Sequence, residues 1–221
     1  AAAIGAQFWQ STAIEIINST ITEANGGNAS AGIGGSRYGS ESKYDVSIKI
    51  QNSTVNATGG QHGAGIGAGY DVHCNGENFT AKNHIEIDAT SKINAKGGKY
   101  APGIGTGYHS AYLTGSIAEG AQVAAVSGEY FYKDAYTTAQ NIGYGVVDPA
   151  REFSGANAVV TFTVAGKVID NPMGYAFDES KKTYTVYNAT GLVKLNALFV
   201  DKKAGKGVKM VLANDIDFTG Q

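Results

Sequence analysis

Gly65-Ile66-Gly67 is one copy of a short motif that recurs along this chain. The other copies are Ala3-Ile4-Gly5, Gly32-Ile33-Gly34 and Gly103-Ile104-Gly105. An Ala-x-Gly-Gly segment precedes each of the last three copies: Ala24–Gly27, Ala57–Gly60 and Ala95–Gly98. Its second Gly always lies five residues before the first Gly of Gly-Ile-Gly. A fixed motif in successive units is typical of repeat proteins, whose units stack to bury a continuous core.

The stretch before each Gly-Gly pair alternates isoleucine with a charged residue. The three examples are Ile14-Glu15-Ile16, Ile48-Lys49-Ile50 and Ile85-Glu86-Ile87. Alternation with a period of two indicates a strand with one face in a core and the other in water. The repeats lack the apolar spacing of a helix and carry glycines that would break one. We therefore expect an all-β fold, a right-handed parallel β-helix. Ile33, Ile66 and Ile104 should be buried in register on successive turns, and Ile16, Ile50 and Ile87 should form a second internal column.

The repeat interval is variable. The isoleucines of the motif are separated by 29, 33 and 38 residues, and a degenerate fifth copy, Asn141-Ile142-Gly143, follows after another 38. An aromatic insertion at 130–136 enlarges the corner before that copy. Variable intervals around a fixed motif indicate coils whose surface loops can grow, and such loops are where function is gained.

The pattern changes after residue 145. Val159–Val164 and Lys167–Ile169 predict a hairpin or final coil around Ala165-Gly166. Further on, one apolar helix face is predicted after Thr190, which is a plausible N-cap; this face comprises Leu192, Leu195, Leu198 and Phe199. We expect a β-helix domain at 1–172, a linker at 173–183 and, at 184–221, a short α+β cap that starts a second β-solenoid. The chain opens inside a repeat, so we expect it to be a piece of a longer protein.

The composition excludes several classes of partner. The chain has seventeen basic and nineteen acidic residues, so its net charge is near zero. It also has no basic block, which argues against nucleic acid as a partner. The single cysteine, Cys74, rules out an intrachain disulfide framework and a cysteine-based zinc cluster. No stretch approaches the roughly 18 apolar residues of a membrane-spanning helix. We expect no cofactor, no resident metal and no membrane insertion by this segment.

Two segments resemble known families. The pattern Gly-Gly-x-x-x-Ala-Gly-Ile-Gly that ends at Gly67 resembles the glycine-rich β-helix repeats of large adhesins and carbohydrate-binding proteins on the surface of gut bacteria. The stretch from Tyr184 to Gly220 looks like the start of the GLUG-motif repeat regions of similar surface proteins. The resemblance implies a bacterial cell-surface or extracellular location and a role as adhesin stalk or glycan-binding module. It carries no catalytic signature onto any residue.

Aromatic residues follow the motif at a nearly constant offset. Phe8, Tyr70 and Tyr108 lie four residues after the motif isoleucine, Tyr38 lies five after it, and His109 adjoins Tyr108. Stacked turns are about 4.8 Å apart, so these rings can form a ladder. An exposed ladder would be a platform for sugar rings. The alternative is an aromatic stack that only covers the corner of the coil, contributing about 0.5–1.5 kcal/mol per pair beyond area burial.

Other side chains suggest weaker alternatives. The loop at 71–78 holds His73 and Cys74, and His84 follows, but their spacing is not that of a zinc site. Glu15 and Glu86 would lie two strands apart, near 9.6 Å, which touches the roughly 6.5–9.5 Å range of inverting glycosidases. Lys49 lies between them, as on a solvated face. A polysaccharide lyase or glycosidase is therefore the second hypothesis, and a threonine-rich ice-binding face ranks last.

Overall fold

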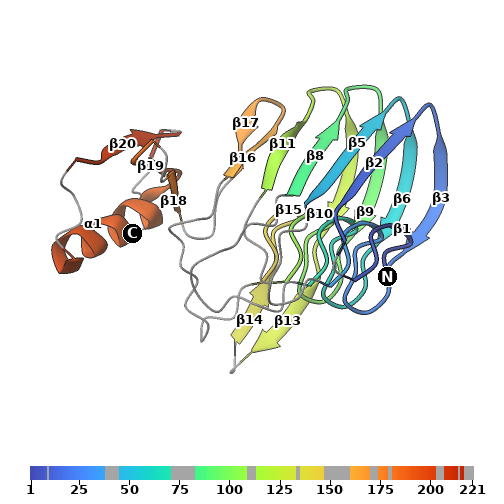
Figure 1. The fold of residues 1–221 in the computed structure, drawn as a ribbon, viewed down its shortest axis with the longest axis horizontal. Coiled ribbons are helices and arrows are strands. Elements are labelled where there is room, and N and C mark those ends of the chain that lie inside the picture. Colours follow the sequence, from blue (N-terminus) through green and yellow to red (C-terminus); the bar gives the residue numbers. More distant parts are fainter. Residues whose placement is uncertain are drawn as a thin grey trace.

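The chain folds as a parallel β-helix followed by a small α/β unit (Figure 1). The computed structural model describes residues 1–8, 10–37, 45–70, 83–108, 113–132, 135–146, 160–169, 174–178, 181–202, 207–213 and 215–216. In these residues each of the first four coils contributes one strand to each of three sheets of parallel coil strands, and the last coil contributes to two of them. The expected β-helix architecture is confirmed.

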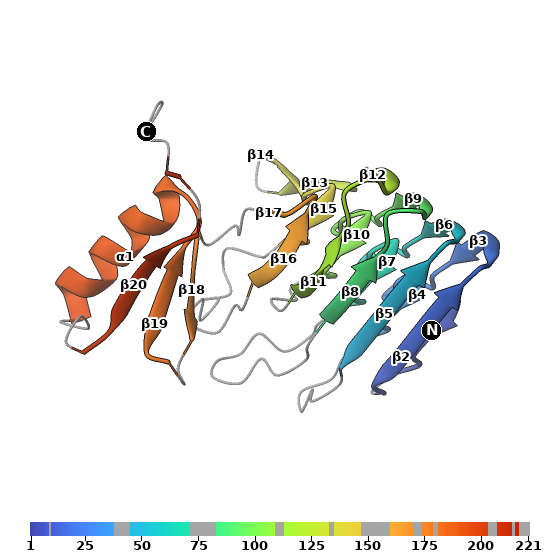
Figure 2. The same ribbon diagram turned by 90° about the horizontal axis from the view of Figure 1, so that it is seen from above.

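The three sheets run along the helix as separate faces. Sheet A holds the two-residue strands β1 (Ile4–Gly5), β4 (Ile33–Gly34), β7 (Ile66–Gly67), β10 (Ile104–Gly105) and β15 (Ile142–Gly143). Sheet B holds β2 (Thr12–Ile17), β5 (Val46–Gln51), β8 (Asn83–Ile87), β11 (Leu113–Ile117), β16 (Val160–Val164) and β17 (Lys167–Val168). Sheet C holds β3 (Thr20–Asn25), β6 (Thr54–Thr58), β9 (Lys92–Lys96) and β12 (Gln122–Val126). Figure 2 shows the strands of sheet B side by side.

Stacked isoleucines fill the interior. Ile33, Ile66 and Ile104 pair in register on successive strands of sheet A, and each is fully buried. The second predicted column, Ile16, Ile50 and Ile87 on sheet B, is also in register and buried. The degenerate copy at 141–143 continues sheet A, because Ile142 pairs with Ile104. Both predicted columns are confirmed.

The second glycine of the motif is required by the backbone. Gly67 has a φ of +134°, a conformation that only glycine adopts readily. A Cβ added to Gly67 would lie 1.9 Å from the carbonyl oxygen of Gly105 in the next coil. The motif therefore keeps glycine here because the coils approach each other too closely for any side chain.

Two hairpins modify the last coils. The aromatic insertion forms the antiparallel pair β13 (Glu129–Tyr132) and β14 (Ala135–Thr138), which projects from the body of the helix in Figure 1. Strand β16 pairs in parallel with β11 and in antiparallel with β17, so the predicted segment is both a final coil and a hairpin.

The C-terminal unit is a three-stranded sheet with one helix beside it. Strands β18 (Tyr175–Asp178), β19 (Thr183–Val186) and β20 (Lys209–Leu212) pair in that order, and helix α1 (Ala189–Lys202) connects β19 to β20. Leu195 of α1 packs against Tyr184 and Val186 of the sheet. That this C-terminal unit starts a second solenoid stays a prediction.

Two local predictions for this unit need correction. Thr190 is not the N-cap, because it lies inside α1, and the Oδ1 atom of Asn188 accepts a hydrogen bond from Gly191 N at 3.0 Å. Asn188 therefore caps the helix, which begins two residues earlier than expected. Part of the predicted 173–183 linker is ordered as β18 and pairs with β19.

The C-terminal unit contacts the end of the β-helix core. Tyr187, just after β19, belongs to the same buried cluster as Tyr144, which follows β15. Burial raises the pKa of the Tyr187 phenol to about 12. Burial, and to a lesser extent Tyr187, also raises the pKa of Tyr144 far above its usual value near 10. In the part of the chain that the structure describes, the Tyr144 hydroxyl has no hydrogen-bond partner.

This buried pair predicts a loss of stability at high pH. Above about pH 10 the unfolded chain releases tyrosine protons that the folded chain retains, so the free energy of unfolding falls by about 1.4 kcal/mol per pH unit for each such tyrosine. Urea unfolding at pH 9 and at pH 11.5 measures the loss. Y144F/Y187F should flatten it without lowering stability at pH 9 by more than about 1 kcal/mol. An unchanged pH dependence in this variant would contradict the assignment.

Candidate functional site

An aromatic cluster lies at one corner of the β-helix, between sheets C and A. Two backbone segments of each coil meet there: the one after Gly-Gly and the one after the Ile-Gly strand. Tyr108 N donates a hydrogen bond to His62 O at 3.0 Å, and Val146 N donates to Tyr100 O at 2.8 Å. Side chains of successive coils therefore interleave at this corner.

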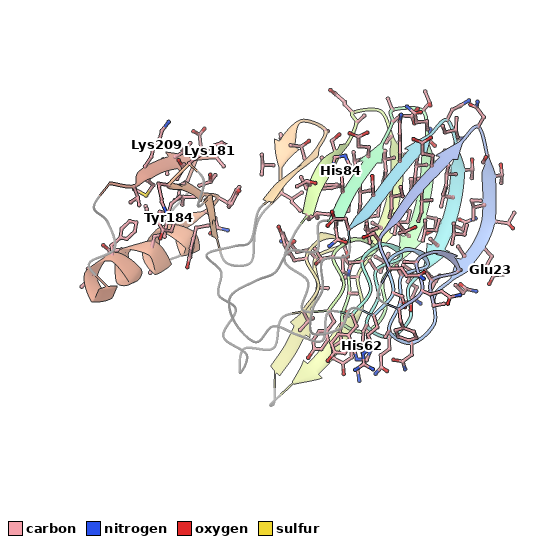
Figure 3. All side chains as sticks on the ribbon, in the orientation of Figure 1. Glu23, His62, His84, Lys181, Tyr184 and Lys209 are labelled. Atoms are coloured by element: carbon pink, nitrogen blue, oxygen red, sulfur yellow. The ribbon has the colours of Figure 1, made fainter. Side chains whose placement is uncertain are left out.

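Four rings from two coils contact one another through His62 and Tyr108. Figure 3 shows His62 among the side chains at the lower corner. The His62 ring lies 4.9 Å from Tyr70, 4.7 Å from Tyr100 and 5.5 Å from Tyr108, measured between ring centroids. Tyr108 also lies 5.3 Å from Tyr70 and 4.7 Å from Tyr100. All four side chains are half-buried. We call His62, Tyr70, Tyr100 and Tyr108 the aromatic corner.

Polar groups border these rings. Asn28 Oδ1 lies 3.2 Å from His62 Nδ1, and the Asn28 amide donates to Gln61 Oε1 at 3.2 Å. Burial lowers the pKa of His62, and the nearby cations Arg37 and Lys99 lower it further, against the raising effect of a hydrogen bond to the Asn28 backbone. His62 is therefore a neutral ring at pH 7 and stacks without a charge of its own.

Two cations stand over the tyrosines. The Arg37 guanidinium carbon lies 5.7 Å from the centroid of Tyr70, and Lys99 Nζ lies 5.6 Å from that of Tyr100. Both distances are within the range of cation–π attraction. Both side chains are exposed to solvent.

The structure brings together only part of the predicted platform. Tyr70 and Tyr108 lie in the aromatic corner, whereas Tyr38 and His109 lie outside the described residues. Phe8 is 53% exposed and makes no ring contact with any other described residue. Because Gly5, Gly34 and Gly67 stack in register, the residue equivalent to Phe8 and Tyr70 in the intervening coil is Arg37.

His62 and Tyr100 were missed by the sequence reasoning. Each is the second residue after a Gly-Gly pair, in Gly60-Gln61-His62 and Gly98-Lys99-Tyr100. This shared offset was a usable signal, but it identifies the same site as Tyr70 only once the two corner segments are known to meet.

The alternative carboxylate site is an alternating column on the outside of sheet B. Glu15 pairs in register with Lys49, and Lys49 pairs with Glu86. The two carboxylates are thus two strands apart with a cation between them, the arrangement of a solvated face. Glu86 Oε1 lies 3.1 Å from His84 Nε2, whose ring Nδ1 lies 2.9 Å from Thr114 Oγ1.

A shallow groove of about 350 Å³ lies on sheet C. Its polar lining consists of Thr54, Asn56, Lys92, Asn94 and Gln122, from strands β6, β9 and β12. It contains no aromatic ring, so it offers hydrogen bonds but no stacking surface. The aromatic corner combines both features and is the better candidate.

Among the residues that the structure describes, no three His, Cys, Asp or Glu side chains come together in a way that could hold a metal ion. The loop with His73 and Cys74 lies outside the described residues. Within the described ranges, no helix has both the length and the apolar character needed to cross a membrane.

Comparison with known proteins supports the fold. A family model described as a beta helix repeat matches residues 48–70. That stretch covers one turn of the helix, from β5 through β6 and the corner to Tyr70. The searches of curated proteins and of solved structures each returned no match. A β-helix repeat is compatible with a surface module and with a lyase-type enzyme, and the adhesin and GLUG resemblances stay predictions.

Proposed function

We propose that this β-helix is a non-catalytic module of a bacterial cell-surface protein and that it binds glycans at the aromatic corner. The observation that carries the proposal is the cluster of His62, Tyr70, Tyr100 and Tyr108. Four half-exposed rings from two coils offer a wide stacking surface on a rigid scaffold. The resemblance to surface adhesin repeats supports the location.

The chemistry of the corner suits a sugar. Tyrosine combines an apolar ring face, on which the C–H face of a sugar can pack, with a hydroxyl that can hydrogen-bond. Asn28 and Gln61 provide amide donors and acceptors beside the rings. Because the rings already contact one another, little side-chain entropy is lost when a ligand binds, which favours affinity.

The absence of catalysis is part of the proposal. A glycosidase needs two carboxylates that flank one bond, with the general acid held protonated. Glu15 and Glu86 lie two strands apart with Lys49 paired to both, so that column lacks a carboxylate pair facing one space. Release of reducing ends or unsaturated products from a panel of pectins and host glycans would favour the enzyme instead.

The binding proposal predicts the effect of removing a ring. On a glycan array, the full chain should bind a subset of glycans. Tyr70→Ala and Tyr100→Ala should each weaken that binding about tenfold or more, because each removes a stacking face. Tyr70→Phe should retain most of it, since the ring remains.

Two controls keep the test specific. Phe8→Ala removes an exposed ring outside the aromatic corner, and Asn56→Ala changes the groove on sheet C, so both should bind like the unmodified chain. Thermal unfolding of each variant shows whether the coil is intact. Unchanged binding by folded Tyr70→Ala and Tyr100→Ala, or no binding by the unmodified chain, would overturn the proposal.

A further inference from the structure

The charge of the aromatic corner narrows the class of glycan, an inference that rests on the proposed function. The two segments that build the corner comprise residues 28–30, 36–37, 61–63, 69–70, 99–101 and 107–108. They contain one Arg and one Lys but no Asp or Glu. The chain as a whole carries a net charge of −2. These residues therefore carry a formal charge of +2, whereas the chain as a whole is slightly acidic.

The two cations differ in their surroundings. Arg37 has no acidic partner among the described residues, and its exposed guanidinium presents a planar fork of N–H donors that matches a carboxylate or a sulfate. Lys99 follows Gly98, and Glu129 follows the equivalent Gly128 in the next coil. Glu129 therefore lies near enough to reduce the positive potential at Lys99, whereas no described carboxylate does so at Arg37.

Both cations are held where a sugar on the rings would meet them. Arg37 stands over Tyr70 and Lys99 over Tyr100, and these two rings both stack on His62. A neutral sugar on this surface would offer the two cations no charged group. A sugar with an anionic substituent would add charge-assisted hydrogen bonds, which are about twice as strong as neutral ones.

We propose that the aromatic corner binds an acidic saccharide, with its ring on the tyrosines and its carboxylate or sulfate on Arg37 and Lys99. Arg37 and Lys99 would bind a carboxylate and a sulfate in the same way, by charge-assisted hydrogen bonds. A matched set of probes distinguishes the two groups. The set is galactotetraose, tetragalacturonic acid and 6-O-sulfated galactotetraose, printed beside the wider glycan array.

We expect the chain to prefer acidic probes over the neutral one, and we expect this preference to depend on Arg37 and Lys99. The unmodified chain should bind the tetragalacturonate, the sulfated probe or both more tightly than galactotetraose, and raising the salt concentration should reduce the difference. R37Q/K99Q should weaken binding of the acidic probes about tenfold without affecting the neutral one. Glu129→Gln should strengthen acidic binding. K49Q/K167Q changes the net charge equally away from the corner and should have no effect.

Different results would contradict the acidic-saccharide proposal and the glycan-binding proposal. Equal binding of acidic and neutral probes, or a preference that survives in R37Q/K99Q, would overturn this inference and leave glycan binding intact. If the unmodified chain binds none of the printed glycans, neutral or acidic, both proposals fail. Loss of preference in K49Q/K167Q as well would show a non-specific effect of net charge and also overturn the inference.

Discussion

Gly67→Ala is expected to lower the free energy of unfolding of the β-helix by about 4 kcal/mol or more. The added Cβ would lie 1.9 Å from the Gly105 carbonyl oxygen, a backbone atom that cannot rotate away. The φ of +134° at this position is also strained for alanine. The two coils must separate to admit the methyl group, which breaks the parallel pairing of β7 with β10.

Gly166→Ala is the matched control. Gly166 also has a positive φ, +78°, but a Cβ added there meets nothing within 4 Å. It lies in the hairpin between β16 and β17, and alanine should cost only about 1–2 kcal/mol of backbone strain. Urea unfolding followed by circular dichroism compares the two variants. Similar costs at both positions would contradict the close approach of the coils at Gly67.

Ile66→Ala is expected to cost about 2–5 kcal/mol, the range for a fully buried aliphatic side chain. Ile66 is fully buried between Ile33 and Ile104, which occupy the same column in the neighbouring coils. Because each coil contacts only its neighbours, the cavity should also weaken the coupling between the two halves of the helix. We expect a broader unfolding transition or two transitions by scanning calorimetry.

Ile17→Ala provides the comparison for this prediction. Ile17 is exposed on β2, so its truncation should cost about 0.5 kcal/mol and leave the shape of the transition unchanged. If truncation of Ile66 were as mild as truncation of Ile17, the isoleucine of the motif would not be a core contact, and the stacking of the coils would be in error.

The coil could be predicted because the residues that determine it lie within one short motif, and the motif is repeated. Each Gly-Ile-Gly copy carries its own buried isoleucine and its own glycine with positive φ, so one register rule places Ile33, Ile66 and Ile104 together. Alternation at Ile48-Lys49-Ile50 likewise fixes which face of β5 points inward. Repetition of the motif made these predictions consistent with one another.

The site was only half predictable because it joins segments from different parts of the repeat. Tyr70 and Tyr108 follow the motif at a fixed offset, but His62 and Tyr100 precede it. Their contact depends on how two corner segments of successive coils lie against each other. In the second coil Tyr38 is the nearest aromatic residue and was predicted to join the ladder. The register of the strands instead makes Arg37 the residue equivalent to Tyr70.

The C-terminal unit was the least predictable part. Asn188 and Thr190 are both good N-cap residues, and only the backbone geometry selects Asn188. The contact of Tyr187 with the cluster that contains Tyr144 depends on how the unit meets the last coil. No periodic signal links these two positions, because the repeat has ended between them.

The most direct test of glycan binding at the aromatic corner is a crystal structure of the full chain with the array glycan that binds best. We predict a sugar ring in van der Waals contact with Tyr70 and Tyr100, within reach of Arg37 and Lys99. A sugar bound instead in the groove on sheet C, beside Thr54 and Gln122, would contradict the account and show that the rings serve only to cover the corner of the coil.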